Sequence, residues 1–281
     1  MLELIHWQIF FVLLAAGFIG AQSVRPLNQS ILTSTESDTK STSANRSRVM
    51  AWAISAGVYL AILSSAIIVG LILTVLLDIP GAPLIEGALR GTASPSLWTT
   101  VIMPVLAGLA LGVTISPLAL YQPKERRVDF YNIAIWKRLL AGLFHGGIVE
   151  EIVFRWFLLS LFVWLLSFVP GFTTSAAPND TFWIANTIAA LLFGLAHLPG
   201  SAATAPLTQI AFILAIALNI LVGLIYGYFF WVSGIEAAML AHMSTHVALQ
   251  PCSSLLLRVR GISKVAPNNA FNTDTPKRRA G

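Results

Sequence analysis

Residues 181–235 read TFWIANTIAALLFGLAHLPGSAATAPLTQIAFILAIALNILVGLIYGYFFWVSGI, and they contain no Asp, Glu, Lys or Arg. A helix needs roughly 20 mostly apolar residues to cross the hydrocarbon core of a membrane. Pro199, Gly200 and Pro206 divide the stretch into two segments, each long enough for one crossing. We therefore predict two successive membrane helices here.

The composition of the whole chain extends this prediction to the rest of the sequence. Hydrophobic residues make up 56% of the 281 residues and charged residues 10%, against about 25% charged residues in a typical soluble domain. So few charges do not cover the surface of a soluble protein of this size. The single cysteine, Cys252, forms no internal disulfide. Soluble, disordered and disulfide-stapled classes are therefore excluded.

Five further apolar stretches complete the predicted set of membrane helices. They are residues 4–21, 50–77, 97–121, 139–169 and 237–257. The predicted fold class is all-α, a polytopic transmembrane helical bundle of about seven membrane helices.

Polar intervals set the predicted organisation of the chain. We expect a first membrane helix at 1–22, a Ser/Thr-rich flexible cytoplasmic linker at 23–49, two membrane helices at 50–121, a membrane core at 122–257 and a basic disordered tail at 258–281. Glu3 and the absence of a base at the start favour a retained first helix over a cleaved signal peptide.

The basic residues predict the orientation in the membrane. With the N-terminus outside, 15 Lys and Arg fall in the cytoplasmic segments and only Arg90 falls outside. Cytoplasmic loops carry this excess of positive charge, so we expect a cytoplasmic C-terminus and, as the location, the plasma membrane. Apart from Arg155, the bases lie in loops and in the tail, where we expect them to contact the lipid bilayer. No basic groove with interleaved aromatic residues is evident, so nucleic acid is excluded as a partner.

Charged residues inside a predicted membrane helix are costly and are therefore candidates for function. The helix at 139–169 contains Glu150, Glu151 and Arg155, in the run VEEIVFR at 149–155. Residues four apart share a face of an α-helix, so we expect Glu151 to pair with Arg155. Glu150 points about 100° away and has no local cation. For the pair by itself, a role in joining helices stays open.

Three histidines are the available partners for Glu150. His197 lies close to the break at Pro199, and His242 and His246 are four residues apart on the last predicted helix. Glu150 and His246 each lie about 18 Å along a helix from a base at the predicted cytoplasmic end. We expect one carboxylate and three imidazoles to meet in the cytoplasmic half of the membrane. A single membrane histidine is, however, more often a packing residue.

Two further histidines and a pair of glycines are interpreted as packing residues. His6 and His145 have no partner at a suitable spacing in the sequence. Gly223 and Gly227 are one helical turn apart and predict a small-residue face that packs against another helix. None of these four residues is assigned a role in chemistry.

The charged residues and histidines resemble the signature of the intramembrane proteases related to the CAAX prenyl protease Rce1, also called the Abi or CPBP family. That signature is Glu-Glu-x-x-x-Arg, then Phe-x-x-x-His, then His-x-x-x-Asn or Asp, on successive membrane helices. The resemblance covers about residues 136–250, within the predicted core at 122–257. The matching positions are Glu150, Glu151, Arg155, Phe193, His197 and His242, with His246 in the place of the final Asn or Asp.

The resemblance implies an endopeptidase that hydrolyses peptide bonds of membrane protein or peptide substrates with an activated water. By the family pattern Glu150 is the general base, and His197 helps to hold the water. His242 and His246 stabilise the oxyanion. Glu151, Arg155 and Phe193 support the site. A neutral imidazole donates one hydrogen bond, so His246 replaces the N–H of an Asn amide.

The resemblance leaves two accounts of the water-activating group. The sequence contains no His-Glu-x-x-His, and we favour the account without a cofactor, in which the glutamate acts by itself. The alternative is zinc, with Glu150, His197, His242 and His246 as the ligands, because imidazole and carboxylate are ordinary zinc ligands.

Two other classes of function remain open. A non-proteolytic member of the family, acting as a scaffold or immunity protein, keeps the fold with an altered site, and His246 in the Asn position favours it. A transporter uses buried ionisable residues as a proton or ion relay. Here these residues cluster at one depth and no repeat is evident, which speaks against transport.

Overall fold

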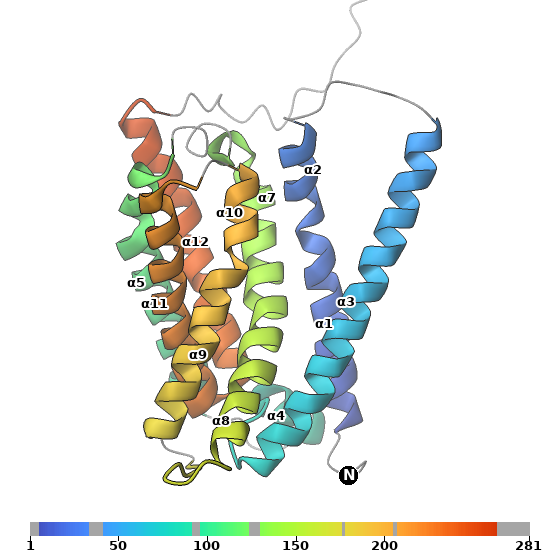
Figure 1. Cartoon of the computed structure of the whole chain (residues 1–281), viewed down its shortest axis with the longest axis vertical. Coiled ribbons are helices and arrows are strands. Elements are labelled where there is room, and N and C mark those ends of the chain that lie inside the picture. Colours follow the sequence, from blue (N-terminus) through green and yellow to red (C-terminus); the bar gives the residue numbers. More distant parts are fainter. Residues whose placement is uncertain are drawn as a thin grey trace, which may run out of the picture.

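A computed structural model describes residues 6–33, 42–91, 96–123, 130–175, 178–204 and 207–262. These residues form helices, with no strand among them, and the helices stand side by side as a bundle (Figure 1). The predicted all-α bundle is confirmed. In chain order the helices are α1 Trp7–Ser23, α2 Arg25–Thr33, α3 Thr42–Leu76, α4 Pro83–Arg90, η2 Trp98–Ile102, α5 Met103–Ile115, η3 Ser116–Tyr121, α7 Ile135–Leu140, η4 Ala141–Glu150, η5 Ile152–Leu159, α8 Ser160–Leu166, α9 Asp180–Ala196, α10 Leu198–Thr204, α11 Gln209–Ser233 and α12 Ile235–Val259.

Within the described ranges, five helical stretches are long and apolar enough to cross a membrane. They are Trp7–Ile31, Val49–Leu76, Trp98–Tyr121, Asp180–Ala203 and Gln209–Ser233. The other two predicted crossings, 139–169 and 237–257, correspond to the continuous run from α7 to α8 and to α12. These two carry the charged residues and two of the histidines of the predicted site. The multi-pass membrane bundle is therefore established, and the count of seven stays a prediction.

Parts of the predicted linker and tail fall outside the described residues. The linker prediction, 23–49, includes α2 and the first turns of α3, and its residues 34–41 are not described. Of the tail prediction, 258–281, only the residues up to 262 are described. The N-terminal end of α1 and the C-terminal end of α12 lie at opposite ends of the bundle (Figure 1), as an odd number of crossings requires.

Glycines let the helices approach closely. A Cβ on Gly108 or Gly112 of α5 would collide with backbone carbonyl oxygens of α12. A Cβ on Gly227 of α11 would collide with the side chain of Asn186 on α9, whose amide donates to the carbonyl of Leu224 at 3.0 Å. Small residues allow such backbone contacts in membrane proteins. The predicted packing face at Gly223 and Gly227 is thus the contact between α11 and α9.

The run from α7 to α8 is the helix that positions the site. Its middle, η4 and η5, is π-helical, with hydrogen bonds between residues five apart and therefore wider turns than an α-helix. It packs against α1, α3, α9, α11 and α12. Trp156 anchors it, because the buried indole fits over Gly70 of α3 and its Nε1–H donates to the carbonyl of Ile67 at 3.2 Å.

Candidate active site

Two neighbouring carboxylates mark the junction of η4 and η5, and they face different surroundings. Glu151 is completely buried, whereas the side chain of Glu150 is 19% exposed and lines a cavity. Adjacent residues on a helix point in different directions. The separation of the two side chains that the sequence predicts is therefore present in the structure.

Glu151 is held by two partners through the same oxygen. Its Oε1 lies 3.0 Å from Nη1 of Arg155 and 2.6 Å from Nδ1 of His242. The guanidinium of Arg155, also buried, lies over the ring of Phe193 at 4.3 Å and over that of Tyr226 at 5.4 Å. Such cation–π contacts are strongest where water is excluded. Glu151, Arg155 and the aromatic rings thus form a compact buried support beside the cavity.

His242 is oriented by this support. Its Nδ1 contacts Glu151, and its ring stacks with that of Tyr226 at 4.6 Å and with that of His246 at 5.2 Å. A carboxylate at Nδ1 fixes which nitrogen is left for other partners. Nε2 therefore faces the site, beside Gly146, where an added Cβ would lie only 3.1 Å from it.

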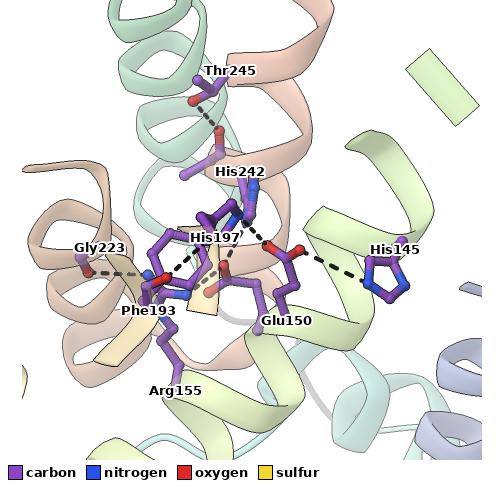
Figure 2. A network of polar contacts seen from close by, with 10 residues as sticks. His145, Glu150, Arg155, Phe193, His197, Gly223, His242 and Thr245 are labelled. Carbon is purple, nitrogen blue, oxygen red and sulfur yellow. Dashed lines mark hydrogen bonds and ion pairs between the residues drawn. The ribbon is translucent and has the colours of Figure 1, made fainter. Parts of the chain in front are cut away.

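His197 approaches Glu150 with a defined nitrogen. Its Nδ1 lies 2.8 Å from the carbonyl oxygen of Phe193, and because a carbonyl only accepts, Nδ1 must carry the proton of this hydrogen bond. In the neutral ring Nε2 then presents a lone pair. This Nε2 lies 3.7 Å from Oε2 of Glu150, so the two acceptors face one another across a short gap (Figure 2).

His246 lies one turn further along α12, next to the glycines of η4. A Cβ on Gly142 would overlap its ring, and one on Gly146 would lie 3.3 Å from its Nε2. Its Nδ1 is buried and has no hydrogen-bond partner among the described residues. His246 lines the same cavity as Glu150 and His197.

In the structure a fourth imidazole, that of His145, lies beside Glu150, although the sequence analysis interprets His145 as a packing residue. Nε2 of His145 lies 3.9 Å from Oε1 of Glu150. In an α-helix, residues five apart point about 140° away from each other, which is why no partner was expected for His145. In the π-helical η4 residues five apart lie close together. His6, by contrast, is exposed and contacts Arg90.

The cavity around Glu150 has a volume of about 720 Å³ and is bounded by helices from both halves of the chain. Most of its lining is apolar, contributed by residues such as Leu27, Ile62 and Leu249. Asn28 and Arg138 add polar groups from α2 and α7, at the end of the bundle where α2 and α10 lie (Figure 1).

The donor atoms at the site are of the type that zinc prefers, nitrogen and oxygen. Among the residues that the structure describes, however, no three His, Cys, Asp or Glu side chains are placed as ligands of one ion. Nδ1 of His197 and Nδ1 of His242 are each occupied by a hydrogen bond within the protein. This leaves Nε2 of each ring toward the site, as in histidines that bind a metal through one nitrogen and a protein oxygen through the other. The account without a cofactor therefore stays a prediction.

The fold and the site together define a multi-pass helical membrane protein with a carboxylate and imidazoles around a cavity within the bundle. Residues 132–248 match the family model described as type II CAAX prenyl endopeptidase Rce1-like. The resemblance inferred from the motifs is confirmed, and all seven motif positions fall within the matched segment. No curated protein and no solved structure matches the chain.

Proposed function

We propose that the protein is an intramembrane endopeptidase that hydrolyses peptide bonds of membrane-associated substrates with a water activated by Glu150 and His197. The observation that carries this proposal is the pair of facing acceptors, Oε2 of Glu150 and Nε2 of His197, 3.7 Å apart at the wall of the cavity. The Rce1-like family is a protease family, which supports the same reaction class.

The pair of acceptors suits the activation of one water molecule. A water beside the gap donates one hydrogen to the carboxylate and the other to the imidazole, each at an ordinary hydrogen-bond length. Since 3.7 Å is too short for a water on the line between them, the water lies to the cavity side. Its oxygen lone pair then points at an incoming carbonyl carbon, and Glu150 accepts the proton as the C–O bond forms. Glu150 then gives this proton to the amine nitrogen as the C–N bond breaks, which restores the carboxylate.

His242 and His246 are the proposed donors to the oxyanion. They are one turn apart with parallel rings, and Nε2 of each lies beside Gly146, one turn before Glu150. Donors fixed in advance stabilise developing charge most where water is scarce. Glu151 and Arg155 position His242 and take no part in bond breaking.

The proposed substrate is a membrane protein or membrane-bound peptide. The mainly apolar lining of the cavity accepts side chains that favour lipid, while Asn28 offers a polar side chain to backbone at one end. The direct test is proteomics of membranes that contain either the wild-type protein or Glu150→Ala. A precursor that accumulates with the variant supports a protease; identical proteomes favour the second candidate, a non-proteolytic scaffold or immunity protein of the family, which His246 in the Asn position supports.

The protein is proposed to lie in the plasma membrane, with its N-terminus outside the cell and its C-terminus in the cytoplasm. We expect reporter fusions after Thr35 and Ser263 to be cytoplasmic and a fusion after Thr174 to be external, because 15 bases lie in the inner segments and one in the outer ones. An external Ser263 fusion would contradict the orientation, and together with a cytoplasmic Thr35 fusion it would also contradict the number of crossings.

Substitutions of His246 test the proposal that no metal takes part. If His246 only donates a hydrogen bond, His246→Asn should keep most of the activity, because the amide supplies an N–H. His246→Ala should lose about 10²–10³-fold in kcat, the usual cost of one oxyanion donor.

A zinc enzyme would behave differently. Both substitutions would then lower activity alike, because Asn is a poor substitute for imidazole as a zinc ligand. Elemental analysis before and after treatment with a chelator provides the independent measurement. Stoichiometric zinc that leaves and returns together with activity would refute the metal-free proposal.

A further inference from the structure

His145 and His197 flank Glu150 on opposite sides (Figure 2). Nε2 of His197 faces Oε2, and Nε2 of His145 faces Oε1 at 3.9 Å. The two imidazoles reach the carboxylate from different elements: His145 comes from η4 itself and His197 from the end of α9. Each oxygen of Glu150 therefore has its own imidazole.

Glu150 depends on these neighbours for its orientation. None of the described residues lies within hydrogen-bond distance of its carboxylate; the two imidazoles are its nearest polar neighbours, at 3.7 and 3.9 Å. The last torsion of a glutamate is broad and has no sharp preferred value. A carboxylate that has lost its partner on one side would therefore rotate and no longer hold Oε2 opposite His197.

The surroundings of His145 place its N–H on the side that faces Glu150. Its ring packs edge-on against Tyr59 of α3, with the ring centroids 6.0 Å apart, and its side chain is 21% exposed. Nδ1 is buried without a partner among the described residues. A proton on Nδ1 would be a buried donor with nothing to accept it, which is costly. The neutral ring therefore carries its proton on Nε2, facing Oε1.

We propose that His145 is a positioning residue of the hydrolytic site, which holds Glu150 by the electrostatic attraction between its Nε2–H and Oε1, 3.9 Å away. His197 differs from it in kind, because the proton of His197 is bound to Phe193 and its Nε2 is an acceptor. One imidazole thus orients the carboxylate and the other shares the water with it. This inference rests on the proposed protease function.

The π-helical turn is what makes this arrangement available. An α-helical path through 141–150 would turn His145 away from Glu150 by about 140°. The wide turns bring the two side chains to the same face, and Gly146 and Gly147 between them leave room for His242 and Met243 of α12. The conformation of η4 therefore serves the site as well as the packing.

The test compares two substitutions that differ in one hydrogen-bond donor. His145→Leu removes the donor, and His145→Gln keeps a neutral N–H at a similar reach. With a fluorogenic peptide or a purified precursor as substrate, we expect His145→Leu to lower kcat by about 10²-fold, the cost of a small misplacement of a catalytic group, with KM within twofold. His145→Gln should recover most of that loss. His6→Leu, a remote histidine, is the matched control and should leave kcat unchanged.

Each outcome decides the inference. A wild-type kcat in His145→Leu, or equal losses in the Leu and Gln variants, overturns the positioning role. If His145→Leu fails to insert, His145→Ala replaces it in the same comparison, and equal thermal unfolding of the variants verifies their fold. Glu150→Gln separates the two proposals: an inactive Glu150→Gln beside a fully active His145→Leu refutes the positioning role alone, and an active Glu150→Gln refutes the protease mechanism and this inference with it.

Discussion

Glu150→Gln should lower kcat by about 10²–10⁴-fold, the contribution of a positioned general base, and leave the protein folded and inserted. The amide keeps the shape of the side chain but does not accept a proton from water. Glu150 makes no ion pair with Lys or Arg in the described structure, so its loss leaves no buried cation without a partner. The measurement is kcat on a peptide substrate together with thermal unfolding in detergent.

A second glutamate provides the control for this substitution. Glu86 is in the first turn of α4 and its Oε1 accepts from the N–H of Ala82 at 3.3 Å, away from the cavity. Glu86→Gln removes the same charge and should keep wild-type kcat. If Glu150→Gln retains more than about a tenth of the activity, Glu150 is not the base.

Glu151→Gln should act on stability instead, lowering the free energy of unfolding by about 3–5 kcal/mol, the cost of breaking a buried ion pair by removing one partner. Arg155 is 2% exposed and Glu151 is the one carboxylate within salt-bridge distance of it in the described chain. The substitution leaves this charge uncompensated and also deprives His242 of its partner at Nδ1. Thermal unfolding in detergent and the yield of inserted protein measure the effect.

The double variant Glu151→Gln with Arg155→Met provides the check on this explanation. Replacing both partners of a buried pair by groups without charge is often nearly neutral, so the second substitution should restore much of the lost stability. Equal destabilisation by Glu150→Gln and Glu151→Gln would show that the two carboxylates do not have separate roles.

The membrane bundle and one half of the site follow from local sequence rules. Long apolar stretches predict the helices, because their length is set by the thickness of the membrane. The pair of Glu151 with Arg155 follows from a spacing of four residues, and the structure has it at 3.0 Å. In both cases the physical cause acts within one helix, where spacing along the chain determines position in space.

Contacts between helices could not be predicted in the same way. The spacing of His242 and His246 indicates a shared face but not which glutamate the face meets. In the structure Nδ1 of His242 contacts Glu151, and His197 and His145 flank Glu150. Which histidine meets which glutamate depends on how α12 and α9 pack against η4 and η5. Glycines and aromatic rings from several helices together determine that packing.

His145 was missed for a different reason. The sequence interpretation assumes an α-helix, in which residues five apart diverge, and η4 is π-helical. Three glycines in six residues, Gly142, Gly146 and Gly147, are the one local signal of an unusual helix. Wide turns of this type occur frequently at functional sites, so such a run beside a membrane glutamate is a reason to consider residues five apart as well as four.

The size of the cavity has a consequence for the thermodynamics of substrate entry. At about 30 Å³ for each molecule, 720 Å³ holds on the order of two dozen waters, most of them against apolar walls that offer no hydrogen bonds. A substrate that enters displaces this poorly held solvent, which favours binding. In the proposed mechanism, the water beside Glu150 and His197 has two acceptors and would be the last to leave. Binding of the substrate would thus remove bulk water from the cavity and leave the one molecule that the proposed reaction uses.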